Sequence, residues 1–138
     1  MNLNQVTLNC LNTLETVEFY QKLGLLLIVD SLPRYARLEC PVGDSTLSVQ
    51  LDPEADTRPS GHTSNNDNVT LYFECDDLDK DICRLRSLGI EIDQEPTDRE
   101  WLWREVYLKD PAGNKICLYH AGDNRKNPPW RVKSKFEK

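Results

Sequence analysis

The sequence predicts an α+β fold made of two tandem copies of a βαβββ module, and three observations support this. Segments about 65 residues apart are similar, so that Gln5–Asn12 aligns without a gap on Thr70–Asp77. The order of strand, helix, glycine and strand is the same after both segments. A turn of the form Pro-x-Gly-Asp/Asn, at 41–44 and at 111–114, precedes an alternating strand in each copy. Because a duplicated unit builds two similar half-surfaces, we expect a ligand site between the copies.

The first module is predicted over about residues 3–52. Alternation predicts a strand over Val6–Cys10. The next segment has apolar residues at helical spacing, namely Leu14, Val17, Tyr20 and Leu23. Asn12 and Glu15 have the spacing of a capping box, and Gly24 is a typical helix end. Three further strands are predicted, over Leu25–Asp30, Tyr35–Cys40 and Leu47–Leu51.

The second module is predicted over about residues 68–120, after a linker at 53–67 that is rich in Pro, Ser, Gly, Asn and Asp. Its expected elements are a strand over Val69–Cys75, a helix capped by Asp77 and ended by Gly89, and strands over Ile90–Asp93, Leu102–Leu108 and Lys115–Tyr119. We therefore expect one domain over 1–120. A basic tail containing Pro and Trp follows over 121–138, and its Trp130 is either solvated or docked on the body or on a second subunit.

Composition narrows the class of protein. A length of 138 residues is enough for one domain with a core. The net charge of −6 argues against nucleic-acid binding, and no apolar run approaches the roughly 18 residues of a membrane span. The N-terminus has no secretory pattern. Five cysteines without a C-x-x-C pair indicate free thiols in a cytoplasmic protein.

Strand alternation separates an apolar face, expected under the helices, from a polar and aromatic face. The second face carries Gln5, Thr7, Asn9, Arg37, Glu39, Ser48 and Gln50 from the first module, and Thr70, Tyr72, Glu74, Trp103, Glu105, Tyr107, Cys117 and Tyr119 from the second. A face that only meets water would carry more Lys and fewer Trp, Tyr and Gln. The pattern therefore favours a concave, solvent-filled pocket.

Four segments together suggest a family: Gln5–Leu8, Val17–Gly24, Phe73–Asp79 and Lys109–Ile116. They include the motifs FY-x-x-LG and DP-x-GN. Over about residues 3–120 the chain resembles the glyoxalase, bleomycin-resistance and extradiol-dioxygenase (vicinal oxygen chelate) superfamily. The resemblance implies that the modules form a curved mixed sheet, a half-barrel cleft with the helices on its outer face. It also implies a cleft often completed by dimerisation, and a divalent metal in many enzyme members.

The resemblance also implies where a metal would bind. The four ligand positions of the family's enzymes fall on Gln5, Ser48, Thr70 and Cys117. Only Gln5 matches the family's pattern, and the set offers no carboxylate or imidazole to a hard divalent cation. A shift of two residues would bring in Gln50 and Glu74 but no histidine, and His62 and His120 lie elsewhere in the chain. We therefore expect neither a metal nor another cofactor.

Other chemistry remains open. The catalytic candidates are Glu39, Glu74, Glu105 and Cys117. A desolvated carboxylate could act as a general base, or it could pair with Arg37 or Lys109. A thiol would need a nearby cation to become reactive. Arg37 is a candidate anchor for an anionic group. Trp101 could stack on a planar ligand. The expected ligand-binding set is Gln5, Arg37, Ser48, Gln50, Thr70, Tyr72, Trp103, Tyr107, Cys117 and Tyr119.

Two functions follow from this pattern. The favoured one is a small-molecule binding protein of the bleomycin-resistance type, with the cleft shared by two subunits. The alternative is an enzyme, either a lyase or isomerase similar to lactoylglutathione lyase or a dioxygenase relative, which would use a pocket carboxylate or a rearranged metal site. A homodimer is expected because an open half-barrel leaves strand edges exposed.

Overall fold

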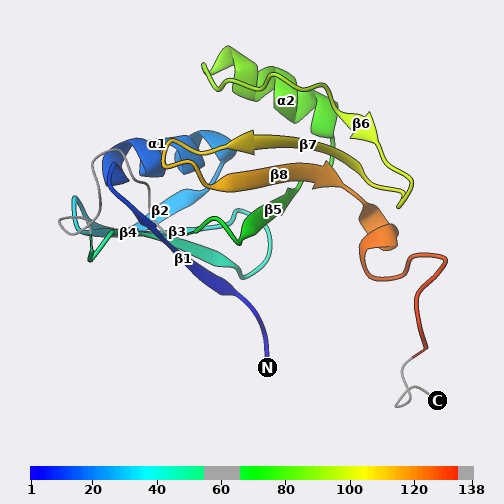
Figure 1. Ribbon diagram of the computed structural model, residues 1–138, viewed down its shortest axis with the longest axis horizontal. Coiled ribbons are helices and arrows are strands. Elements are labelled where there is room, and N and C mark those ends of the chain that lie inside the picture. The colour runs from blue at the N-terminus through cyan, green and yellow to red at the C-terminus, as the bar shows by residue number, and fades with distance from the viewer. Residues whose placement is uncertain (55–65, 134–138) are drawn as a thin grey trace.

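The computed structural model describes residues 1–54 and 66–133, and it confirms the α+β fold of paired modules (Figure 1). The first module consists of β1 (Gln5–Cys10), α1 (Thr13–Leu23), β2 (Leu26–Ser31), β3 (Tyr35–Glu39) and β4 (Thr46–Leu51). The second consists of β5 (Thr70–Glu74), α2 (Leu78–Ser87), β6 (Thr97–Asp98), β7 (Arg104–Lys109) and β8 (Lys115–His120). The short 3₁₀ helix η2 (Gly122–Arg125) then begins the tail.

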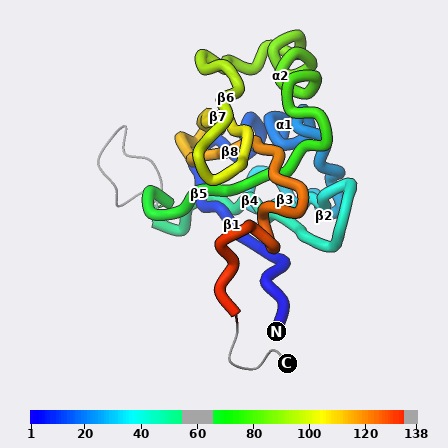
Figure 2. The backbone as a smooth tube through the Cα atoms, turned by 90° about the vertical axis from the view of Figure 1, so that its right-hand side faces the viewer, coloured from blue at the N-terminus to red at the C-terminus, as the bar shows by residue number. Residues whose placement is uncertain are grey.

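The two modules have the same topology. The strand orders are β1-β4-β3-β2 and β5-β8-β7-β6, so the first strand of each module pairs in parallel with its last. The other pairs are antiparallel. The two four-stranded sheets form an arch, and the N-terminal residues and the tail as far as residue 133 lie on the side away from α2 (Figures 1 and 2). The duplication seen in the sequence is therefore a duplication of whole sheets.

One hydrophobic core joins the modules. Predicted inward positions on both sheets are buried, among them Leu8, Val49, Ile116 and Leu118. From α1, Tyr20 is fully buried, and its ring centroid lies 6.1 Å from that of Phe73 in the other module. Because apolar burial is the main stabilising contribution to folding, this shared core makes the two modules one structural unit.

The motif DP-x-GN is a structural lock between the modules. The buried carboxylate of Asp110 accepts hydrogen bonds from the backbone N–H groups of Ala112 (2.9 Å) and Asn114 (2.8 Å) and from the Asn114 side chain (2.8 Å). It also accepts one from the Tyr20 hydroxyl at 2.7 Å. Gly113 has a φ of 86°, a conformation that favours glycine. Tyr20 of the motif FY-x-x-LG thus donates a hydrogen bond to Asp110 of the motif DP-x-GN.

One expected strand does not form. The segment Ile90–Asp93 is not paired as a strand, and the two-residue β6 is the neighbour of β7 instead. The Arg86 guanidinium donates to the carbonyls of Ile92 (2.8 and 3.2 Å) and Gln94 (2.9 Å). These carbonyls are therefore held by α2 rather than by β7. The side-chain oxygen of Gln94 accepts the Tyr107 N–H at 3.2 Å, in place of a backbone partner.

The ends and faces of the helices differ in part from the expectation. Val17 and Tyr20 are buried as predicted, but Leu14 is exposed, and α1 also buries Thr13, Thr16 and Phe19. Asn12 does not cap α1 with its side chain, which donates to the Pro111 carbonyl at 3.0 Å. Asp77 does cap α2, since it accepts the Lys80 N–H at 3.1 Å.

Two expectations fall partly outside the described residues. They are the linker at 53–67, of which 55–65 are not described, and the last five residues of the tail. Within the described ranges, no helix has both the length and the apolar character needed to cross a bilayer.

Candidate functional site

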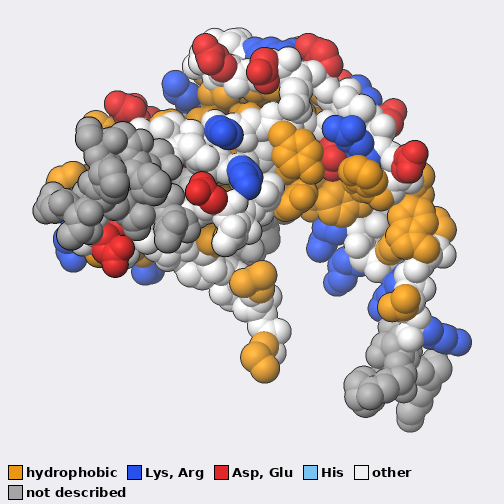
Figure 3. Space-filling view, in the orientation of Figure 1, with side chains coloured by type: hydrophobic (Ala, Val, Ile, Leu, Met, Phe, Trp, Pro, Cys, Tyr) orange, Lys and Arg blue, Asp and Glu red, His pale blue; other side chains and the backbone are white. Residues whose placement is uncertain are grey.

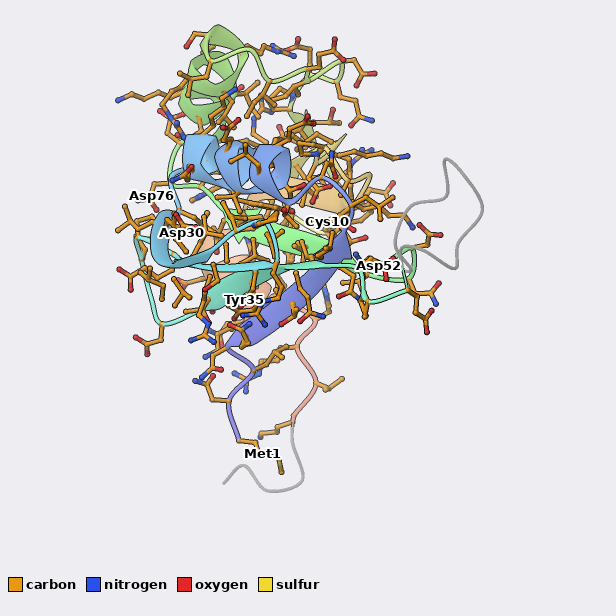
Figure 4. All side chains as sticks on the ribbon, turned by 90° about the vertical axis from the view of Figure 1, so that its left-hand side faces the viewer. Met1, Cys10, Asp30, Tyr35, Asp52 and Asp76 are labelled. Carbon is orange, nitrogen blue, oxygen red and sulfur yellow. The ribbon has the colours of Figure 1, made fainter. Side chains whose placement is uncertain are left out.

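On the first sheet, the face away from α1 is held by its own hydrogen bonds. Ser48 is fully buried, with the Gln5 amide nitrogen 2.8 Å from its hydroxyl and the Tyr35 hydroxyl at 2.6 Å. The Gln5 side-chain oxygen accepts a bond from Thr46. The Ser48 bond, with help from Arg37, lowers the pKa of Tyr35. In Figure 4, Tyr35 lies on the side of the sheet away from α1. The structure thus joins predicted ligand-binding residues in one network.

Arg37, the expected anion anchor, belongs to the same network. Its Nε donates to the Tyr35 hydroxyl at 3.0 Å, and its guanidinium lies 5.6 Å from the centre of the Tyr35 ring. Next to it, the Gln50 amide donates to Asn9 at 3.1 Å. The side-chain donors of this face therefore bond mainly to neighbouring residues of the same face.

On the second sheet, the corresponding face carries an aromatic group formed by Tyr72, Trp103, Tyr107 and Tyr119. The rings of Trp103 and Tyr119 are stacked, with centroids 4.5 Å apart and planes 14° apart. Tyr72 meets both edge-on, at 6.0 and 5.8 Å. Tyr119 is buried, but Tyr72 is 49% exposed. The group is therefore ordered from beneath and open to a ligand from above.

The carboxylate of Glu105 is buried beside this group and has partners. It accepts a hydrogen bond from Arg99 Nε at 3.2 Å and a weaker one from Trp101 Nε1 at 3.4 Å. Arg99 is the cation partner in place of the expected Arg37 or Lys109. The only sequence signal for this pair is that Arg99 and Glu105 are six residues apart, on either side of the β6–β7 turn. Glu39, another catalytic candidate, is exposed on β3.

Glu74 positions the start of the tail. Its Oε2 accepts the backbone N–H groups of Ala121 (2.7 Å) and Gly122 (2.9 Å), and Arg125 lies 3.8 Å from its Oε1. These bonds give partners to two backbone donors where η2 begins. Glu74 therefore acts here as a structural cap for η2.

Cys117 is buried under the aromatic group and lies opposite Tyr72 and Tyr107 in the sheet. Burial raises the pKa of its thiol to about 12, so that very little thiolate forms at neutral pH. His120 does not assist it, because its Nδ1 lies 2.7 Å from the Cys75 carbonyl oxygen. The arrangement makes Cys117 part of the floor of the face, without the features of a nucleophile.

A large open hollow lies at the edge of β7, between that strand and the segment that follows α2. Its volume is about 1140 Å³, comparable to that of small-molecule pockets. Of the predicted ligand-binding residues, Thr70 and Tyr107 line it. Lys109 and Lys115 also line the hollow, and neither was predicted to bind a ligand. Extending the strand alternation by one step toward the hairpin would have placed them on the same face.

The space-filling view shows a second, wider concavity between the N-terminal residues and the tail, with hydrophobic side chains along its tail side (Figure 3). The two polar faces of the arch belong to different sheets. The hydrogen bonds of Gln5 and Ser48 described above stay within β1, β3 and β4, whereas Cys117 packs with the aromatic group of the second sheet.

Comparison with known proteins identifies the family. Residues 2–118 match the model of the Glyoxalase/Bleomycin resistance protein/Dioxygenase superfamily. The chain belongs to this superfamily. The matched range contains both sequence motifs and nearly all of both modules. A search of curated proteins found no match.

Solved structures support the same fold. A glyoxalase/bleomycin resistance protein/dioxygenase from Nocardioides is 24% identical with a TM-score of 0.71, covering 96% of this chain and 90% of that one. Lactoylglutathione lyase from Agrobacterium tumefaciens is 20% identical with a TM-score of 0.66, covering 95% and 97%. TioX from Micromonospora sp. ML1 is 17% identical with a TM-score of 0.66, covering 88% and 99%. At these identities the likeness establishes the fold alone.

The superfamily's metal does not fit the residues at its four ligand positions. Gln5 and Ser48 bond to each other, Thr70 lies opposite Lys115, and Cys117 is a buried thiol with a raised pKa. In the parts of the chain described, 1–54 and 66–133, no group of three or more His, Cys, Asp or Glu is arranged to hold a metal. A hard divalent cation would have its charge poorly compensated by this donor set.

Proposed function

We propose that this member of the superfamily binds a small molecule on the polar and aromatic faces of its paired modules, without the superfamily's metal. The observation that carries the proposal is the aromatic group, where Tyr72 is half exposed over the stacked pair Trp103 and Tyr119. Planar rings gain from stacked or edge-on contacts with such side chains. The carboxylates of Glu74 and Glu105 already have partners, which favours binding over acid–base catalysis.

We also propose that the protein is a homodimer. The concavity in Figure 3 is open toward solvent, and the β2 edge exposes Leu26 and Ile28. A second copy would cover such an edge and bring further side chains to the cleft. All five cysteines are free thiols, which supports a reducing compartment such as the cytoplasm.

A thermal-shift screen of metabolites, followed by calorimetry on each hit, tests the binding proposal. We expect Tyr72→Ala and Trp103→Ala to weaken a hit's affinity at least tenfold. The matched control is Trp130→Ala, since this exposed tail tryptophan lies outside the aromatic group. Equal losses for Trp103→Ala and Trp130→Ala would contradict the proposal.

Each hit is also assayed for turnover, which tests the enzyme alternative directly. Turnover that is abolished in Glu105→Ala, Glu74→Ala or Glu39→Ala while affinity persists would replace the binding proposal with catalysis by that carboxylate.

A further inference from the structure

Two lysines face each other at the hairpin end of the second sheet. Lys109 on β7 and Lys115 on β8 are direct cross-strand partners, and both are exposed and line the hollow. Like charges directly opposite each other are unfavourable in a sheet. The Lys115 ammonium donates to the Asp67 backbone carbonyl at 2.6 Å, which is a neutral acceptor.

No described acid forms an ion pair with either lysine, although Glu91 and Asp93 also line the hollow. Within residues 1–54 and 66–133, neither ammonium lies within salt-bridge distance of a carboxylate. Thr70 on β5 is the direct partner of Lys115 on its other side, and it lines the same hollow. Two ammonium groups and a hydroxyl therefore form one row of donors, the cationic row, at the end of the sheet.

An aromatic row lies next to the cationic row. Cys117 lies two residues after Lys115 on β8, and its direct partners on the neighbouring strands are Tyr72 and Tyr107. Tyr72 is the main cause that raises the pKa of Tyr107, as expected if the two phenols lie near each other. Two residues of a strand span about 7 Å, which is therefore the separation of the rows. Figure 3 shows Lys and Arg side chains over this part of the molecule and hydrophobic side chains beside them.

We propose that the hollow binds a planar aromatic molecule that carries one anionic group. The anion lies between Lys109 and Lys115 within reach of the Thr70 hydroxyl, and the ring lies over Tyr72 and Tyr107. This inference rests on the proposed function, because both use the aromatic group. Glu91 and Asp93 also line the hollow, on the segment after α2. Their charges would repel a second anionic group, so a monoanion fits better than a dianion.

The test compares two probes that differ only in charge. Calorimetry with 2-naphthoate and with 2-naphthamide measures the contribution of the anion, since the carboxylate and the amide have similar size. We expect the naphthoate to bind at least tenfold more tightly. Lys109→Gln and Lys115→Gln should each weaken naphthoate about threefold to fivefold, as expected for one exposed ion pair, and leave naphthamide unchanged. Lys126→Gln in the tail is the charge-matched control and should change neither affinity.

The outcomes separate this inference from the proposed function. If both probes bind equally and Tyr72→Ala weakens both, aromatic binding stands and the anion site is refuted. An effect of Lys126→Gln as large as that of Lys109→Gln would reduce the preference to the overall charge and would also refute the site. If neither probe binds at millimolar concentration, the anion inference fails, while the metabolite screen still decides the proposed function.

Discussion

Replacement of Tyr20 by phenylalanine tests whether the two motifs lock the modules together. The change removes only the hydroxyl that donates to Asp110 at 2.7 Å, and it leaves the buried ring in the core. Asp110 keeps its bonds from Asn114 and Ala112. The variant should therefore fold with the native topology and lose a single interaction between α1 and the β7–β8 turn.

The expected loss follows from the chemistry of that bond. A hydrogen bond to a charged, buried acceptor contributes about 1.5–3 kcal/mol to the free energy of unfolding. For a chain of this length, each kcal/mol corresponds to roughly 3–4 °C in Tm. We expect Tyr20→Phe to lower the free energy of unfolding by about 2 kcal/mol and Tm by roughly 7 °C.

Urea and thermal unfolding, followed by circular dichroism, measure both quantities. Tyr72→Phe is the control, because it removes the same atom from a half-exposed ring and should cost less than about 0.5 kcal/mol. Equal losses in the two variants, or no loss in Tyr20→Phe, would show that the lock does not stabilise the fold.

Four further predictions test the thiols, the metal and the assembly. Burial raises the pKa of Cys117 from 9.0 to about 12, so its stabilising effect is complete below pH 9 and lost as the pH rises toward 12; by pH 10 the loss is about 1.4 kcal/mol. Urea unfolding at pH 8 and pH 10 should show a smaller loss of unfolding free energy between these pH values in Cys117→Ala than in the wild type. Iodoacetamide at pH 8 should modify exposed Cys83 much faster than Cys117, as peptide mapping would reveal. Calorimetric titration with Ni²⁺, Zn²⁺, Mn²⁺ and Fe²⁺ should show no sub-micromolar site, and one such site per chain would overturn the metal prediction. Sedimentation at micromolar concentration should show a dimer, and a monomer alone would contradict that proposal.

The sequence predicted the order and the type of most elements because local patterns determine them. Alternation in β4 and β8 placed Val49 and Ile116 in the core, as the structure confirms. The expected strand at Ile90–Asp93 was wrong for a reason that no local pattern contains. The Arg86 side chain, from the preceding helix, holds the carbonyl groups that a strand would have offered to β7.

The candidate site was predicted less completely than the fold. The face assignments of Tyr72, Trp103 and Tyr119 followed from alternation, and the structure brings these rings together. The partners of the carboxylates could not be foreseen. A contact such as Arg99 with Glu105 depends on how a long side chain crosses a turn, and strand periodicity does not specify that path.

By itself the sequence determined the duplication, the two motifs and the residue types at the four expected ligand positions, since these depend only on residue type and spacing. Only the tertiary structure decided which residues contact each other. It pairs Asp110 with Tyr20, places the Glu74 carboxylate at the start of the tail, and puts Lys109 and Lys115 side by side at a hollow. Residue identity limits which bonds a side chain can make, but the choice of partner depends on packing between segments far apart in the chain.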